Sequence, residues 1–243
     1  MNNKNSLILP VAIGGIIFLL GIIILAMTWK SNYNSSQTIT VTGSATKEII
    51  SDLAILKGTI TTQSASAEAA YRELESEKPV LLQFLASKGF PKEKVELSAI
   101  THFPIYETAA NGYQTQNIKG YTYNQQVEIQ STDVNKIKQL SIDVASVVEK
   151  GVNFNVNPPE YHYTNLAQLK INMQAEAAKD AMIRADKIAL ATGRKLGPMR
   201  SARMGVLQIT PKYSNQVSDY GVNDISSIDK EITAVVNASF EIE

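Results

Sequence analysis

The sequence predicts an α+β domain of antiparallel strands packed with helices, preceded by one N-terminal transmembrane helix. Residues 7–29 form an apolar run without a charged side chain. Segments with the two-residue period of strands then alternate with segments of helical period, and the last segment alternates strictly. We therefore divide the 243 residues into an N-terminal anchor (1–30), a polar tether (31–37) and one α+β domain (38–243).

The apolar run is predicted to cross a membrane, because a helical span needs about 20 apolar residues. A cleavable signal peptide is the alternative, with Lys4 as its positive start and Ala26 as a small residue near its end. The apolar cores of signal peptides are shorter, about 7 to 15 residues, and end in a small-x-small site that this run lacks. We expect a retained anchor that contacts the membrane through residues 7–29.

The side of the membrane has to be judged from other features, since Lys4 and Lys30 flank the run on opposite sides and almost balance. The chain has no cysteine, so it has no disulfide, zinc-thiolate site or thiol nucleophile, and an oxidising compartment would not harm it. We expect a single-pass protein of the cytoplasmic membrane with its domain on the periplasmic or extracellular side.

The first half of the domain contains four predicted strands and one helix. Residues 38–42 and 53–62 have the alternation of strands. Residues 65–88 have helical spacing that ends at Gly89, and Pro79 is expected to kink or split that helix. Residues 95–106 and 118–130 are predicted to form a hairpin, because Asn111 and Gly112 between them tolerate the positive φ of a turn.

The second half begins with a helix that Asp133 can cap and Gly151 ends. Residues 161–163 form a short predicted strand, and residues 165–192 form the longest helical pattern, ended by Gly193. Residues 210–230 lack periodicity, which predicts a functional loop or disorder. One face of the final strand is predicted to meet the core; its residues are Ile232, Ala234, Val236, Ala238, Phe240 and Ile242.

The sequence contains few candidates for a nucleic-acid, metal or catalytic site. After the first 30 residues the chain carries 21 basic and 23 acidic side chains, so it has no basic footprint for nucleic acid. His102 and His162 are its two histidines, and neither has the spacing of metal ligands. No Gly-x-Ser-x-Gly elbow is present. We predict no catalytic residue, no cofactor and no metal, and hence a domain that is not an enzyme.

Tyrosines gather around the predicted hairpin and the short strand that follows it. Most are expected to pack on the sheet, because aromatic side chains favour strands. The alternative is an interaction surface, since tyrosine covers area at low entropic cost and is enriched at interfaces. The candidate residues for that surface are Tyr106, Tyr113, Tyr121, Tyr123, Tyr161 and Tyr163.

Three stretches resemble the SIMPL-domain family. Ile39-Thr-Val-Thr-Gly43, followed by residues 51–56, resembles its first two strands with a small-residue turn between them. Residues 89–98 resemble its helix-to-strand link. The alanine-rich residues 175–197, which end in a Gly-x-x-Leu-Gly turn, and the final segment 231–242 are the most specific.

The resemblance implies a SIMPL-like α+β domain that is exported in bacteria, in a family loosely associated with envelope integrity and oxidative-stress tolerance. It transfers no catalytic residues, and it argues for the fold rather than for a site. Our leading hypothesis is therefore a non-enzymatic envelope protein whose domain binds another envelope protein or its own copies as a homo-oligomer. The alternative is an extracytoplasmic enzyme or small-ligand-binding domain with a pocket that sequence does not reveal.

Overall fold

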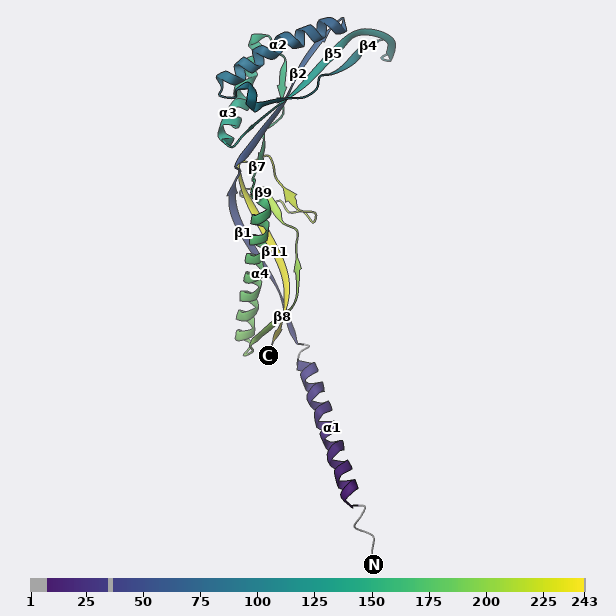
Figure 1. Cartoon of the computed structure of the whole chain (residues 1–243), viewed down its shortest axis with the longest axis vertical. Coiled ribbons are helices and arrows are strands. Elements are labelled where there is room, and N and C mark those ends of the chain that lie inside the picture. Colours follow the sequence, from purple (N-terminus) through teal and green to yellow (C-terminus); the bar gives the residue numbers. More distant parts are fainter. Residues whose placement is uncertain (1–7, 35–36, 243) are drawn as a thin grey trace, which may run out of the picture. The chain divides into compact units, whose positions relative to one another are not determined.

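The structure is a computed structural model that describes residues 8–34 and 37–242, with side chains described at 14–29 and 37–242 (Figure 1). The chain forms two compact units. Unit 1 contains Met1–Lys47, Ala167–Leu207 and Thr233–Glu243, and unit 2 contains Glu48–Leu166 and Gln208–Ile232. Strands β1 (Thr38–Ile50) and β11 (Asp229–Ile242) each contribute residues to both units.

Helix α1 (Ile8–Asn34) contains all of the apolar run except Leu7, which lies outside the described residues, as do tether residues 35 and 36. Every large apolar side chain described in α1 between Ile16 and Trp29 is exposed. Within the part of the chain that the structure describes, no helix combines the length and apolar character of a membrane span.

Unit 1 is built around helix α4 (Leu166–Ala191), which lies along β1 and β11 (Figure 1). The helix buries one residue per turn, and four of these are alanines, at 177, 181, 185 and 189. Strand β11 buries alternate residues from Ile232 to Phe240, as its sequence predicts, whereas Ile242 is half-buried. Strand β8 (Leu196–Met204) pairs antiparallel with β11. Small side chains on α4 allow the helix to approach the sheet closely.

Strand β1 continues to Ile50, so the strand predicted at residues 38–42 is too short. Gly43 lies inside β1 and not in a turn. A Cβ atom at Gly43 would come within 2.3 Å of both the Ala177 carbonyl oxygen and the Ala181 nitrogen of α4. The glycine therefore permits the close approach of a helix, which local sequence cannot distinguish from a turn signal.

Unit 2 contains an antiparallel sheet in the order β3 (Val95–Leu97), β5 (Gln114–Ser131), β2 (Leu53–Ser64) and β6 (Phe154–Val156). Strand β4 (Thr101–Thr108) also pairs with β5, and β7 (Glu160–His162) also pairs with β2. Helices α2 (Ala67–Ser87) and α3 (Val134–Asp143) and the 3₁₀ segments η1 (Lys92–Lys94) and η2 (Val144–Lys150) complete this half. The core includes Leu56, Ile60, Leu85, Val127 and Ile129.

Three local predictions in unit 2 can be compared with the structure. Helix α2 continues through Pro79, so the proline does not split it. The β4–β5 hairpin is confirmed, with φ 83° at Gly112 in its turn, but the predicted strand 95–106 is divided into β3 and β4, and β5 already begins at Gln114. The predicted cap at Asp133 is confirmed, since its side-chain oxygen accepts from Lys136 N, and the structure adds a cap at Ser66, whose hydroxyl oxygen accepts from Ala69 N.

The aperiodic residues 210–230 are held by polar contacts to a buried lysine. Strands β9 (Gln208–Pro211) and β10 (Val222–Asn223) pair in parallel across the segment. Lys230 is 2% exposed, and its ammonium donates to the carbonyl oxygens of Tyr161, at 2.7 Å, and of Asp224. The Asp224 carboxylate accepts from the hydroxyls of Ser226 and Ser227. These contacts order a loop that has no apolar pattern of its own.

Candidate functional site

The β4–β5 hairpin extends past the end of β2 as a two-stranded ribbon. Strand β2 pairs with β5 as far as Ser64 opposite Tyr121, and the part of β5 before Tyr121, from Gln114 to Gly120, pairs only with β4. Figure 1 shows this end of the hairpin curving away beside the start of α2. The ribbon therefore has faces that no described helix covers.

One face of the ribbon is aromatic and apolar. Residues directly opposite each other on paired strands point to the same face, and the pairs here are His102 with Tyr123, Pro104 with Tyr121, and Tyr106 with Ile118. The ring centroids of His102 and Tyr123 are 5.0 Å apart and nearly parallel, with an interplanar angle of 15°. We call these six residues, with Tyr71 of α2, the aromatic face.

The aromatic face continues the helix-covered side of the sheet. Tyr71 meets Tyr123 edge-on, with 6.0 Å between ring centroids. Next to Tyr71 in the first turns of α2, the Ala70 carbonyl accepts at 2.8 Å from the hydroxyl of Thr62 on β2, and Thr62 is buried. Helix α2 begins at Ala67, so its cover of the sheet ends near Tyr71. Tyr106 and Ile118, further along the ribbon, are 38% and 49% exposed.

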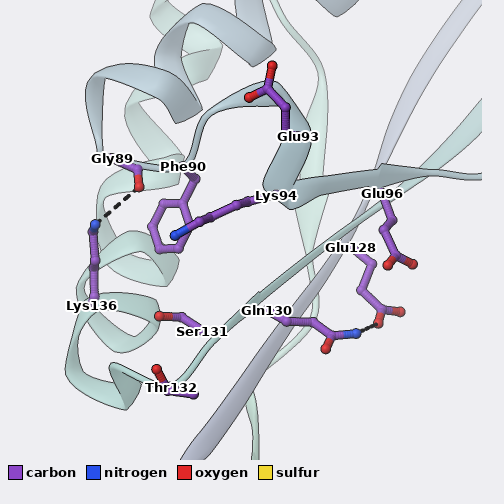
Figure 2. A pocket seen from close by; sticks show the side chains of 10 residues that line it. All are labelled: Gly89, Phe90, Glu93, Lys94, Glu96, Glu128, Gln130, Ser131, Thr132 and Lys136. Carbon is purple, nitrogen blue, oxygen red and sulfur yellow. Dashed lines mark hydrogen bonds between the residues drawn. The ribbon is translucent and has the colours of Figure 1, made fainter.

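A second candidate lies in unit 2 between η1, β5 and the start of α3. Ten residues line this open pocket of about 340 Å³ (Figure 2). At one end Lys136 donates to the Gly89 carbonyl at 3.1 Å and lies 4.9 Å from the centre of the Phe90 ring. At the other end Figure 2 shows the carboxylates of Glu96 and Glu128 side by side. Glu93 and Lys94 also line the pocket, so groups of both signs surround it, and two carboxylates lie together at the Glu96–Glu128 end.

The negative end of this pocket joins a row of charges across the uncovered side of the sheet. Glu128 lies opposite Glu96 on β3 and opposite Lys57 on β2. Lys57 donates to the Glu160 carboxylate at 3.0 Å. That bond lowers the pKa of Glu160 and raises the pKa of Lys57. Like charges opposite each other on a sheet are unfavourable, and Lys57 reduces that cost here.

The family pattern named SIMPL and described as a protein of unknown function (DUF541) matches residues 39–240. The chain belongs to the SIMPL family. The match covers both units except residues 1–38, which include α1 and the first residue of β1, and residues 241–243, which include the end of β11. It confirms the resemblance seen in the sequence.

One relative of this SIMPL protein is described as uncharacterized protein YggE of Edwardsiella ictaluri (strain 93-146). It is 22% identical over 178 residues, which cover 72% of this chain and 70% of the relative.

The SIMPL domain separates the six predicted surface tyrosines into two groups. Tyr106, Tyr121 and Tyr123 lie on the aromatic face, and Tyr113 is 75% exposed at the hairpin turn. Tyr161 is 6% exposed and belongs to the core, so including it in a surface was wrong.

Tyr161 and Tyr163 are also far from the aromatic face. Tyr161 pairs with Ala54, and Tyr123 pairs with Thr62, eight positions further along β2. At 3.4 Å per residue, eight positions correspond to about 27 Å. Tyr161 and Tyr163 instead line a small cavity of about 50 Å³ with Ile209 and Lys230. The six tyrosines lie close together along the chain, but strand register decides which of them lie close together in space.

The two histidines of the SIMPL domain have different surroundings. His102 stacks on Tyr123, and His162 Nε2 lies 3.4 Å from a Glu160 carboxylate oxygen. Within the described part of the chain, no three histidine, aspartate or glutamate side chains gather as metal ligands would. His102 is thus part of the aromatic face, a role that its strand position and aromatic neighbours could have indicated.

Proposed function

We propose that this SIMPL protein is a non-enzymatic, membrane-anchored protein of the cell envelope whose domain self-associates through the aromatic face. The observation that carries the proposal is the exposed pair Tyr106 and Ile118, next to the half-buried Tyr121, on a ribbon that extends past the end of β2. Exposed apolar surface of this kind is typical of protein interfaces, and tyrosine is enriched in them.

The composition of the face supports a second copy of the chain as the partner. The face contains no aspartate, glutamate, lysine or arginine. When two copies meet through the same patch about a two-fold axis, each side chain approaches its own equivalents, so a patch without charges avoids repulsion.

The edge of the ribbon is less suited to association than its face. Strand β4 carries Pro104, which has no N–H to donate, and its pairing with β5 shifts register between Ile105 and Tyr106. Proline and bulges are features that prevent strand addition at sheet edges. These features disfavour strand addition beside β4, and we propose that a partner packs against the side chains of the aromatic face.

The apolar run of residues 7–29 supports the anchor, and the absence of cysteine suits a domain outside the cytoplasm. The association of the family with envelope integrity and oxidative-stress tolerance suggests the process to which the protein contributes. We propose that role on the family resemblance alone.

The test is the mass of the full chain in mild detergent, measured by size-exclusion chromatography with light scattering. We expect an oligomer that becomes a single chain when Tyr106→Ser and Ile118→Ser are combined. Phe103→Ser is the matched control, because Phe103 is 58% exposed on the opposite face of the same hairpin and should leave the oligomer intact. A single-chain mass for the unaltered protein, or equal loss in both variants, would contradict self-association through this face.

The pocket of Figure 2 supports a second candidate function, the binding of a small zwitterionic molecule. Its ammonium group would meet Glu96 and Glu128, and its carboxylate would meet Lys136. Calorimetric titration of free amino acids into the full chain would test this. Binding that is lost in Lys136→Met and in Glu128→Gln would favour it over the interaction module, while the absence of heat for any of them would exclude it.

A further inference from the structure

The end of unit 1 that contains the α4–β8 turn is strongly basic in an otherwise neutral chain. The whole sequence has 23 basic and 23 acidic side chains. Residues 187–203 hold no acidic side chain and five basic ones, which are Lys187, Arg194, Lys195, Arg200 and Arg203. We call residues 187–203 the basic turn.

The acidic groups near the basic turn offset only part of this charge. Arg200 pairs with the Glu241 carboxylate of β11. Asp186 precedes the turn directly. Glu243 follows Ile242, which pairs with Leu196 of the turn, and with these three acids included the region retains a net charge of +2, from five positive and three negative groups. Such an excess attracts anionic surfaces within about one Debye length, roughly 8 Å at physiological salt.

The basic turn also carries exposed apolar side chains. Leu190 on the last turn of α4 is 57% exposed, Ile188 is 46% exposed, and Met199 on β8 is 47% exposed. Basic side chains next to exposed leucine and methionine are the combination that binds the interface of an anionic bilayer, where cations meet phosphates and apolar groups enter the acyl boundary.

Hydrogen bonds connect the basic turn to the residue where the tether joins the domain. Arg194 Nη1 donates to Gln37 Oε1 at 2.7 Å, and Ile242 N donates to the Gln37 carbonyl at 3.2 Å. Gln37 is the residue immediately before β1. The turn therefore lies at the end of unit 1 that the chain enters from the apolar run.

The length of chain between the apolar run and Gln37 is short. Helix α1 continues from Trp29 to Asn34, which at 1.5 Å per residue adds about 8 Å. Three further steps to Gln37 add at most about 11 Å, even if fully extended. Gln37 then lies no further than roughly 19 Å from the edge of the hydrocarbon core, whose polar headgroup layer is itself about 5 to 8 Å thick.

We propose that the basic turn docks on the headgroups of anionic phospholipids and holds unit 1 against the membrane surface. The inference rests on the proposed anchor, since only a span at residues 7–29 brings Gln37 within this reach. Arginine and lysine donate to the lipid phosphates, and Leu190 enters the interface beside them. The chemistry selects phosphatidylglycerol over phosphatidylcholine, because only the former carries a net negative charge.

The cysteine-free chain allows a spin label to be placed at any single position. We would label Leu190→Cys in the basic turn, Leu20→Cys in the apolar run, and Tyr220→Cys, which is 97% exposed in unit 2, as a solvent reference. The full chain is reconstituted into nanodiscs of phosphatidylcholine alone or mixed with phosphatidylglycerol. Relaxation by a water-soluble nickel chelate and by oxygen then reports the depth of each label.

We expect the label at residue 190 to lose most of its accessibility to nickel in discs with phosphatidylglycerol and to regain it when Lys187→Glu and Lys195→Glu are combined. Circular dichroism of that variant checks that the domain is folded. If the label at 20 is embedded but the label at 190 stays as accessible as that at 220, the docking is refuted while the anchor stands. Equal protection at 190 in both lipids also refutes docking through charge. If the label at 20 is accessible to water, the anchor fails and the inference with it.

Discussion

Gly43 is the position where one added carbon atom should disturb unit 1 most. In Gly43→Ala the new Cβ would be 2.3 Å from the Ala177 carbonyl oxygen, 2.3 Å from the Ala181 nitrogen and 2.7 Å from the Ala181 Cα. Ordinary contacts of a Cβ atom begin near 3.4 Å, so α4 must move away by about 1 Å. The obstructing atoms are helix backbone, and no side-chain rotamer can relieve the overlap.

Overpacking of a core costs about 1–3 kcal/mol and occasionally more. Because the helix that must move buries alanines on four successive turns, we expect a loss near the upper end, about 3 kcal/mol. For a chain of this size that corresponds to a fall in Tm of about 6–12 °C. Hydrogen exchange of α4 amides, followed by mass spectrometry on the full chain in detergent, would report the loss locally.

Two variants make this test specific. Ser44→Ala is the matched control, because Ser44 contributes its backbone N–H, which donates to Asp180 at 2.8 Å, and this bond survives the change. Adding Ala181→Gly to Gly43→Ala should not restore stability, since the overlap is with backbone atoms. Exchange in Gly43→Ala that equals Ser44→Ala, or recovery in the double variant, would refute the reasoning.

Three further changes should also have measurable effects. Phe240→Ala, at 2% exposure on β11, should cost about 3–5 kcal/mol in urea unfolding; a cost below about 1 kcal/mol would mean that its site collapses or is open. Lys230→Met should cost about 3–5 kcal/mol, because it leaves the buried Tyr161 carbonyl and the Asp224 carboxylate, 3.9 Å from the lysine nitrogen, without their cation; an unchanged urea midpoint would contradict this. The hydrogen bond from the Ser44 N–H holds the pKa of the Asp180 carboxyl below its ordinary 3.8. The ionised carboxylate therefore stabilises the fold fully above pH 3.8, and this contribution is lost as the pH falls through the lower pKa of the folded protein. In Asp180→Asn the free energy of unfolding should therefore fall less steeply as the pH is lowered. The same acid dependence in the variant and the unaltered protein would contradict this prediction.

The parts of the fold that sequence predicted correctly have local signals. The buried alternation of β11 and the β4–β5 hairpin turn depend on neighbouring residues within one segment. Helix α4 ends as expected before Gly193, which has φ 70°.

The parts that sequence missed depend on distant residues. Gly43 lies in a strand because α4, more than 130 positions later, passes over it, and Ser44 and Asp180 are 136 residues apart. Strand β8 has no strict alternation to reveal it and forms by pairing with β11. The loop before Lys230 is ordered by polar contacts, and contacts of this kind produce no hydrophobic periodicity in the sequence. In the candidate site, the tyrosines on β4 and β5 were found, but their separation from Tyr161 required the strand register.

Strands β1 and β11 are hydrogen-bonded neighbours from opposite ends of the chain, and a side-chain bond between them joins residues 199 positions apart. Unit 1 can therefore close only after the last strand has been synthesised. Most of unit 2, from Glu48 to Leu166, is available much earlier, and its strands mainly pair within that stretch. We expect unit 2 to fold first, while β1 waits with an unpaired edge. Contacts of such long sequence separation form slowly and leave strands open to aggregation in the meantime, so the order of synthesis makes the first strand of the domain the one that most needs protection.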